Sequence, residues 1–508
     1  MKYIITAFIF ILAITLPTSC IDDDEFSSSS SDMLTFSTDT VSMDTTFSNV
    51  PTVTHSFWVY NKSGKGLRNI SARLEKMQQT GFRVNVDGSY LGQQAGWQLP
   101  DIEIRNGDSI RVFVELTSNQ QNAKTPQRVD DNIVFTLESG VQQRVALDAW
   151  SWDATLVNGL EVTHDTTISS ADRPLVIYRG IKVDSAATLT VSAGTTLYFH
   201  QNAGIDVYGR LLCAGERGKT VTLRGDRIDR MFSYLPYDLT PGLWQGVRFR
   251  QSSYNNEIVF ADIHSPYNAV VCDSSDTQIK KLSVRNSKIT NCQGYGIKAT
   301  ASNVLLENDL VANTLGDCVY IAGGVTEMNN CTLAQFYPFS GERGGAIRFT
   351  NRMEDGRSNP MYVTARNSLI TGYADDVLFG EPDTSAVFNY LFANCMIRTP
   401  EVTTADSVCF KGTVFENTED TVSCGEKHFR KIDTDNLRYD FHLDSLSAAI
   451  DKGDVSTSAT ADLDGTVRDD KPDIGCYEYV KANTNTNREQ TENKKIRRYE
   501  RHKVRSLL

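Results

Sequence analysis

The chain has little of the chemistry that builds metal or redox sites. It holds only 7 histidines in 508 residues, and none of its 10 cysteines forms a C-x-x-C pair. Both features point away from a zinc site. Apart from Cys20, every cysteine lies from Cys213 onward, which leaves an odd number of nine. We expect most of these to be small apolar core residues, with one or two disulfide bridges left open.

Positive charge is also scarce. Lysine and arginine total 51 against 63 aspartates and glutamates, so the formal net charge is -12. This balance argues against a general nucleic-acid binder. Residues 481–508 depart from it, because they are rich in lysine and arginine. We expect this basic segment to be a solvated, mobile tail.

The apolar run at residues 3–16 is too short to span a bilayer as a permanent helix. It follows the basic Met1-Lys2 pair and precedes Pro17-Thr18-Ser19-Cys20. This arrangement resembles a bacterial lipoprotein signal, which implies a signal peptide of residues 1–19 and a lipid on Cys20. Residues 22–25 resemble the acidic export tag of some gram-negative lipoproteins. We therefore expect a lipid anchor in the outer membrane, with the protein facing the cell exterior; an ordinary secreted protein is the alternative.

Two further segments precede the repeats. Residues 20–32 are acidic and serine-rich, which is typical of a flexible tether. Residues 33–152 alternate apolar and polar positions between Gly, Asn and Asp turns, as in "DIEIRNGDSIRVFVEL". Alternation over short segments predicts an antiparallel β-sandwich of immunoglobulin-like type. We expect this domain to act as a spacer.

Residues 157–435 contain a repeat with a period of 22 residues. Columns at this spacing are Asn286, Asn308 and Asn330; Val284, Leu306 and Met328; and Ile289, Val311 and Leu333. A second strand in each coil is expected to stack Val270, Ile297, Val319, Ile347 and Val377. Short strands with aliphatic columns at this period predict a right-handed parallel β-helix, whose coils bury their columns against each other. The predicted fold is all-β, and insertions at 335–343 and 352–360 are expected to be outer loops.

Two parts of the chain resemble a known family. "LTVSAGTTLYFHQNAGIDVYGRLLCAGERGKTVTLRGDR" from Leu189 and "PGLWQGVRF" from Pro241 resemble the opening coils of right-handed β-helix lipoproteins. "DFHLDSLSAAIDKGD" from Asp440 and "DLDGTVRDDKPDIGCYEY" from Asp462 resemble the choice-of-anchor Q domain, which usually has Ser-Pro-Ala where this chain has Ser-Ala-Ala at 447–449. The resemblance implies a pectin-lyase-like fold, a closing module at 436–480 and a cell-surface setting, but no single reaction.

One constellation on the β-helix has the residue types that glycan chemistry needs. If Ile297, Val319 and Ile347 point inward, Lys298, Tyr320 and Arg348 point outward in one column, bounded by Val271 and Leu378. These three side chains are catalytic candidates for a polysaccharide lyase, as base and charge neutraliser, or they grip an anionic glycan. An ordinary mixed polar face is the alternative. The carboxylate pair at 375–376 is expected to satisfy a turn rather than to hydrolyse glycans.

Aromatic loops are the second candidate surface. The glycan-binding candidates are Tyr234, Tyr237, Trp244, Phe336 and Tyr337, with Phe232 and Phe339 beside them. Aromatic faces stack on sugars, and exposed aromatic clusters mark binding surfaces. Equally, such loops would cover the wall of the β-helix.

Asp462 and Asp464 are calcium candidates because they lie in a D-x-D-G context, although the glutamate that closes an EF-hand loop is missing. Alternatively, they cap the last coil and prevent end-to-end pairing. No other cofactor is expected.

Together these features predict a surface lipoprotein that binds glycan or mediates adhesion without catalysis. The alternatives are a polysaccharide lyase acting on an acidic glycan and a purely structural surface protein. The expected partners are the membrane, through the N-terminal lipid, and polysaccharide, with no nucleic acid. The sequence leaves the oligomeric state open.

Overall fold

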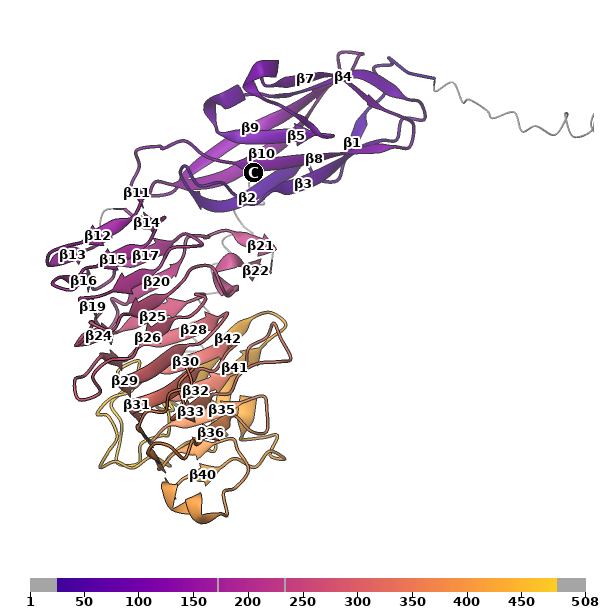
Figure 1. The fold of residues 1–508 in the computed structure, drawn as a ribbon. Coiled ribbons are helices and arrows are strands. Elements are labelled where there is room, and N and C mark those ends of the chain that lie inside the picture. Colours follow the sequence, from indigo (N-terminus) through magenta and orange to yellow (C-terminus); the bar gives the residue numbers. More distant parts are fainter. Residues whose placement is uncertain (1–24, 171–172, 233, 482–508) are drawn as a thin grey trace, which may run out of the picture. The chain divides into compact units, whose positions relative to one another are not determined.

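A computed structural model describes residues 25–481, apart from 171, 172 and 233 (Figure 1). The predicted lipid site at Cys20, the acidic residues 22–24 and the basic tail at 482–508 lie outside the described residues. The chain forms two compact units, Met1–Asp153 and Ala154–Leu508. In the described part, no helix is long and apolar enough to cross a membrane. Five short 3₁₀ helices are η1 (Met77–Gln79), η2 (Gln93–Ala95), η3 (Tyr237–Leu239), η4 (Ala405–Cys409) and η5 (Gly425–His428).

The first unit is a β-sandwich of two five-stranded sheets. In spatial order, one sheet contains β1 (Leu34–Phe36), β3 (His55–Asn61), β8 (Ser109–Leu116), β5 (Phe82–Val86) and β6 (Ser89–Tyr90). The other contains β2 (Thr40–Phe47), β10 (Gln142–Trp152), β9 (Gln127–Thr136), β4 (Leu67–Leu74) and β7 (Gln98–Ile104). All pairs are antiparallel except β2 with β10. Alternate residues of β8 are buried, as the sequence pattern predicts for a strand with one face on a core.

The second unit is a parallel β-helix, so the predicted all-β fold with a sandwich before a solenoid is confirmed. One sheet has 11 strands: β11 (Thr155–Val157), β14 (Leu175–Ile177), β17 (Thr196–Phe199), β20 (Val221–Gly225), β25 (Ala261–His264), β28 (Lys288–Cys292), β30 (Leu310–Thr314), β32 (Thr332–Gln335), β35 (Leu369–Gly372), β38 (Met396–Ile397) and β40 (Val414–Phe415). Two hairpins lie outside the large sheets: β21 (Arg230–Phe232) with β22 (Leu235–Pro236), and β41 (Phe429–Asp433) with β42 (Arg438–Leu443).

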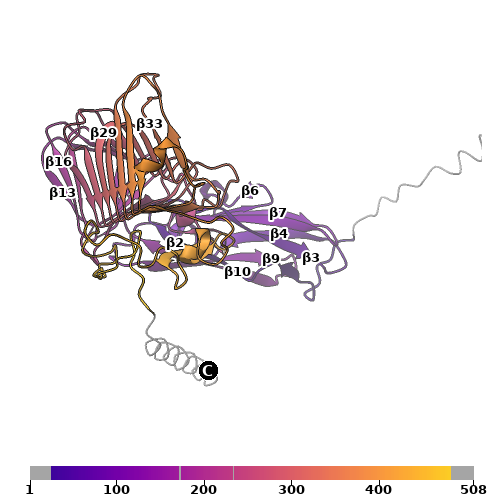
Figure 2. The same ribbon diagram turned by 90° about the horizontal axis from the view of Figure 1, so that it is seen from below.

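The other large sheet has 17 strands and contains two parallel ladders. The first ladder contains β12 (Leu160–Val162), β15 (Ile181–Val183), β18 (Ile205–Val207), β23 (Val247–Phe249), β26 (Val270–Cys272), β29 (Ile297–Glu307), β31 (Val319–Asn329), β33 (Ile347–Thr350) and β36 (Leu378–Glu381). The second contains β13 (Thr166–Ile168), β16 (Thr188–Ser192), β19 (Arg210–Ala214), β24 (Asn256–Val259), β27 (Leu282–Arg285), β34 (Met361–Arg366), β37 (Phe388–Ala393) and β39 (Phe410–Lys411). Strands β29 and β31 are long enough to belong to both ladders. Figure 2 shows β13, β16, β29 and β33 arranged along this sheet.

The predicted columns are in register. Val284 pairs with Leu306 and Leu306 with Met328, while Ile289 pairs with Val311 and Val311 with Leu333. The predicted column that runs from Val270 to Val377 is wrong at its last position, because Ile347 pairs with Leu378 rather than Val377. Val377 still belongs to the turn before β36, where its N–H donates to the carbonyl of Arg398.

Asparagines turn the chain at the same place in successive coils. Asn286, Asn308 and Asn330 have φ angles of 52°, 63° and 50°. Asparagine tolerates this left-handed conformation better than most residues, which explains its recurrence. The pattern continues at Asn367 and Asn394, with φ angles of 47° and 51°. The asparagine column that the sequence spacing identified therefore marks positions where the backbone adopts the left-handed conformation.

The cysteines behave as the composition predicts. Of the nine in the described part, all are free, and all but Cys409 are buried. The disulfide bridges that the sequence left open are not formed among these nine cysteines. Cys272, for example, lies in an inward column between Phe249 and Ala299. These thiols contribute apolar volume to the core.

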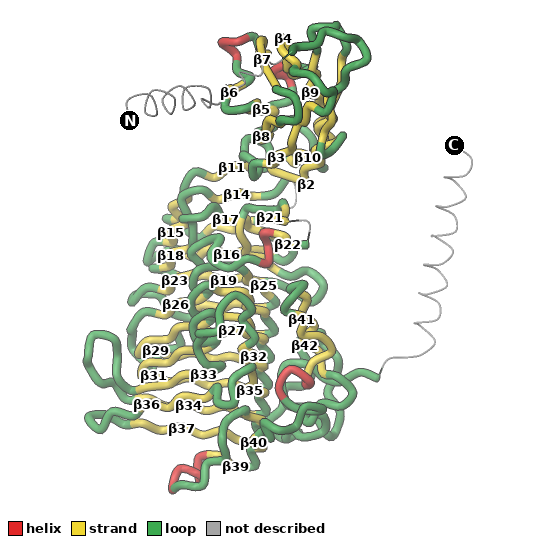
Figure 3. The backbone as a smooth tube through the Cα atoms, turned by 90° about the vertical axis from the view of Figure 1, so that its right-hand side faces the viewer, coloured by secondary structure: helices red, strands yellow, loops and turns green. Residues whose placement is uncertain are grey.

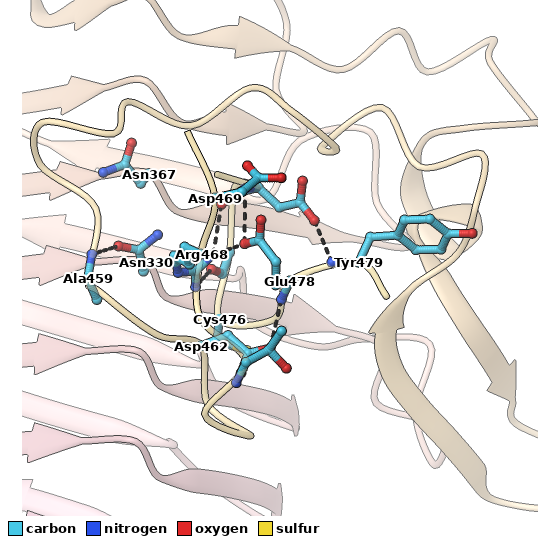
Figure 4. A network of polar contacts seen from close by, with 12 residues as sticks. Asn330, Asn367, Ala459, Asp462, Arg468, Asp469, Cys476, Glu478 and Tyr479 are labelled. Atoms are coloured by element: carbon cyan, nitrogen blue, oxygen red, sulfur yellow. Dashed lines mark hydrogen bonds and ion pairs between the residues drawn. The ribbon is translucent and has the colours of Figure 1, made fainter. Parts of the chain in front are cut away.

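Residues 444–480, which we call the strap, cover the outer face of strands β30, β32, β35 and β38 of the 11-stranded sheet. Apolar strap residues such as Leu463 and Ile474 pack with Leu310, Ala334 and Leu369, which point away from the interior of the β-helix. The turn asparagines hold its backbone: Asn330 Oδ1 accepts the N–H of Ala459 at 2.8 Å (Figure 4). The prediction that Asp462 caps the last coil is therefore wrong. Asp462 belongs to the strap, which buries apolar side chains on the outer face of the sheet.

Candidate functional site

One row of outward side chains runs along the first ladder of the 17-stranded sheet. Figure 3 shows the strands that carry it, including β15, β18, β23, β26 and β29, stacked one above another. In register order the row is Glu161, Lys182, Asp206, Arg248, Val271, Lys298, Tyr320, Arg348 and Phe379. Adjacent strands lie about 4.8 Å apart, so the row extends for roughly 40 Å. A linear polymer of several sugar residues has this length.

The predicted column of Lys298, Tyr320 and Arg348 is confirmed as a set of register neighbours. Val271 precedes it as predicted, but Phe379 follows it instead of Leu378. The N-terminal half of the row was not predicted from the sequence. Those coils have irregular lengths, which hides the register from a search at a fixed period.

Three cavities follow the row and form one groove. The first, of about 570 Å³, lies over the opening coils. It shares Arg248 and Val271 with a second cavity of about 450 Å³. The second shares Met353 and Glu354 with a third of about 340 Å³. The insertion at 352–360 supplies these two shared residues, so this outer loop forms a wall of the groove.

Most of the charged side chains along the row form ion pairs. Lys298 Nζ lies 2.5 Å from Glu354 Oε1, and Arg348 Nε lies 3.1 Å from Asp317 Oδ2. Further along the row, Arg248 lies 3.0 Å from Asp273. Further pairs are Lys182 with Asp184 and Arg250 with Asp206. Cations and carboxylates therefore alternate, and the groove carries little net charge.

Tyr320 lies at the centre of the charged row. Its ring is 5.2 Å from the ring of Tyr295, and Lys298 Nζ lies 5.7 Å from its centroid. Burial, together with the charge of Glu354, raises the pKa of Tyr320 to about 12. The phenol therefore keeps its proton at neutral pH, which opposes a role as general base.

The aromatic candidates separate into buried and exposed residues. Trp244 and Phe336 are 0% exposed and Tyr337 is 4% exposed, so these three cannot stack on a glycan, which corrects the prediction. Trp244 instead stacks on Phe199 at 4.5 Å, beneath its own loop. Tyr234 is 61% exposed and stacks on the exposed Phe232 at 5.7 Å.

Tyr237 and its loop are fastened to the β-helix wall. Arg227 lies 4.1 Å from the centroid of the half-buried Tyr237 ring. Asp238 pairs with Arg224 at 2.8 Å and with His264 at 2.8 Å. The loop between β21 and Trp244 therefore serves mainly as a cover, and among its described aromatic side chains only Phe232 and Tyr234 are exposed.

His264 connects this loop to the β-helix through both ring nitrogens. Nε2 lies 2.8 Å from Asp238 and Nδ1 lies 2.8 Å from Asp262. Burial lowers the pKa of His264, but the two carboxylates outweigh it and raise the pKa to about 9. The imidazole is therefore charged at neutral pH and donates to both carboxylates.

This charge makes stability depend on pH. A histidine with a pKa raised above its unfolded value of about 6.5 stabilises the fold fully below that pH. The contribution is lost as the pH rises through the folded pKa of about 9. We expect the wild type to lose about 3 kcal/mol more than a His264→Gln variant between about pH 6 and pH 10. Urea unfolding of both proteins across this range measures the difference, and parallel pH profiles would contradict it.

The carboxylates of the calcium candidates Asp462 and Asp464 form hydrogen bonds with other groups of the protein. Asp462 accepts the N–H of Thr466 at 2.6 Å on one oxygen. Its other oxygen accepts the N–H of Glu478 at 2.9 Å (Figure 4). Asp464 Oδ2 lies 2.7 Å from His442 Nε2. In the turn before β36, Asp376 accepts the N–H of Leu378, and Asp375 pairs with Arg398. These aspartates organise backbone and ion pairs.

Comparison with known proteins gives no family. No protein-family model matches the chain, and no curated protein matches it. A solved family 123 glycoside hydrolase from Clostridium perfringens shares 8% identity at a TM-score of 0.17, over 24% of this chain and 26% of that one. The chain thus spans about a quarter of that enzyme's length.

Two other solved structures have similarly low scores. The CooA pilin subunit from enterotoxigenic Escherichia coli shares 9% identity at a TM-score of 0.17, over 23% of this chain and 96% of that one. The Yersinia enterocolitica family 28 exopolygalacturonase shares 10% identity at a TM-score of 0.12, over 68% of this chain and 86% of that one. The site therefore has to be interpreted from its own residues.

Proposed function

We propose that the protein is a non-catalytic glycan-binding protein whose ligand lies along the groove of the 17-stranded sheet. The observation that carries this proposal is the unbroken register row from Glu161 to Phe379, with cavities along it from Glu161 to Tyr320. The lipoprotein-like segment ending at Cys20 supports placement at the outer membrane, where such a groove would meet extracellular polysaccharide.

The paired charges favour a neutral glycan over an acidic one. The central cations that would attract a uronic acid are already neutralised, as Lys298 is by Glu354 and Arg248 by Asp273. Carboxylates and guanidinium groups also supply acceptors and donors for sugar hydroxyls. Tyr295 and Phe379 hold two of these cations in place, because Lys298 lies over the ring of Tyr295 and Arg348 over the ring of Phe379. The retained proton of Tyr320 weighs against the alternative of a lyase.

Removing a groove cation should weaken binding. We expect Lys298→Ala and Arg248→Ala each to reduce affinity for the recognised glycan by about 10-fold or more, since a hydrogen bond to a charged group contributes about 1.5–3 kcal/mol. Calorimetry against neutral polysaccharides and polygalacturonate measures this, and binding should change little with salt. Arg285→Ala is the matched control, because Arg285 pairs with Glu307 outside the three cavities.

Equal affinity of the groove variants and the control would refute this location for the site. Tight, salt-sensitive binding of polygalacturonate would overturn the choice of a neutral ligand. Release of unsaturated product, seen as new ultraviolet absorbance and lost in Tyr320→Phe, would replace binding by lyase activity.

A further inference from the structure

A buried cluster of metal-ligating side chains lies where the last coil meets the segment before the strap. Glu416 follows β40, while Cys424 and His428 come from the turn of η5. One ligand atom from each, an oxygen, a sulfur and a nitrogen, lies within 4.8 Å of the others. The side chains of Glu416 and His428 are 0% exposed, and Cys424 is 7% exposed. This chemistry is unrelated to the glycan groove.

The geometry is close to that of a tetrahedral site. His428 Nε2 lies 3.1 Å from Glu416 Oε1. Two ligands about 2.0–2.1 Å from a tetrahedral zinc ion are about 3.4 Å apart, so the pair needs to open by only a few tenths of an ångström. The sulfur of Cys424 lies within 4.8 Å of both other ligand atoms, so it has to approach them by up to about 1 Å.

Surrounding groups orient both nonthiol ligands. His428 Nδ1 lies 2.8 Å from the hydroxyl of Ser447, which leaves Nε2 directed at Glu416. The second oxygen of Glu416 accepts the N–H of Gly425 at 2.9 Å and pairs with Arg398 at 3.3 Å. Outer partners of this kind fix ligand orientation in metal sites.

We infer that Glu416, Cys424 and His428 bind a zinc ion that fastens the end of the β-helix to the closing segment. A thiolate and an imidazole favour zinc over calcium or magnesium. Binding displaces the thiol proton of Cys424 to solvent, and His428 coordinates through Nε2 while Nδ1–H donates to Ser447. Thiolate and carboxylate neutralise the dication, and Asp375, 3.0 Å from Arg398, balances the guanidinium. A water molecule completes the four ligands.

Cobalt substitution tests the ligand set directly. The purified full chain, stripped with a chelator and titrated with Co²⁺, should gain a thiolate-to-cobalt charge-transfer band and visible bands of tetrahedral Co²⁺. Zinc should displace both. Cys424→Ser should abolish the charge-transfer band, whereas Cys395→Ser, which alters another buried thiol, should retain it. No band in the wild type, or a band that survives Cys424→Ser and His428→Gln, overturns the inference.

Stability provides a second test that does not depend on the variants folding. Because zinc binds the folded site, saturating Zn²⁺ should raise the midpoint of thermal unfolding of the wild type, and a chelator should reverse the shift. Elemental analysis after dialysis should give one zinc per chain. Substoichiometric zinc together with an unchanged midpoint would show that these residues form only a polar contact.

Discussion

Replacing Arg468 by methionine is expected to lower the free energy of unfolding by about 3–5 kcal/mol and to release the strap from the β-helix. Only 2% of the Arg468 side chain is exposed, and it lies 2.8 Å from Glu478. Its guanidinium also donates to the carbonyls of Asp473 and Gly475 and to Oδ1 of the turn asparagine Asn308.

The large expected loss of stability arises because the substitution removes the cation that pairs with the buried carboxyl group of Glu478. Glu478 would remain buried without its cation, and burial already raises the pKa of this carboxyl to about 7. Without Arg468 the pKa of Glu478 rises further, so the buried carboxyl must either take up a proton or stay charged without a cation. Both cost more than the loss of an exposed ion pair. The strap would also lose a contact to Asn308, one of the residues that hold it against the sheet.

Urea unfolding and limited proteolysis measure the change, since a released strap becomes accessible to cleavage. Arg430→Met is the matched control: Arg430 is exposed on β41 and makes a contact to the carbonyl of Val480 at 3.3 Å. Equal stability of the two variants would contradict the role assigned to Arg468.

Trp244→Ala should destabilise the β-helix by about 3–5 kcal/mol. Trp244 is 0% exposed, stacks on Phe199 and donates its indole N–H to the carbonyl of His264 at 2.9 Å. The substitution creates a cavity and leaves that carbonyl unpaired. It should also loosen the loop that His264 fastens through Asp238.

Tyr234→Ala in the same loop is the control, because its side chain is 61% exposed and should contribute little to stability. Thermal unfolding of both variants separates a structural aromatic from an exposed one. If Trp244→Ala left the unfolding midpoint unchanged while abolishing glycan binding, the loop would be a binding surface rather than a cover.

The β-helix itself was accessible from the sequence because its forces are local and repeated. Val284, Leu306 and Met328 occupy equivalent positions at a constant spacing, and their strands pair in that register. The turn asparagines were accessible for the same reason, since each coil needs a left-handed residue at one point. Where the spacing changes, the prediction fails: Val377 was expected to stack on Ile347, but the next residue, Leu378, pairs with it.

The groove was only partly predictable. Alternation along a strand determines which side chains point outward, so Lys298, Tyr320 and Arg348 could be placed in one column. The ion-pair partners of Lys298 and Arg348 could not be predicted in this way. Glu354 belongs to an insertion and Asp317 to a turn, and neither position follows the repeat. The ion pairs that neutralise the groove arise from these irregular segments.

The sequence by itself determined the all-β architecture, the coil register over its regular repeats and the core positions of its thiols, because each depends on periodic burial or local backbone preference. Tertiary structure decided where the aromatic loops and the strap lie, and which of Trp244 and Tyr234 remains exposed. It also brought Glu416 to Cys424 and His428, whose spacing matches no familiar zinc motif. These outcomes depend on contacts between segments that are distant or irregular in sequence, and such contacts leave no period in the chain.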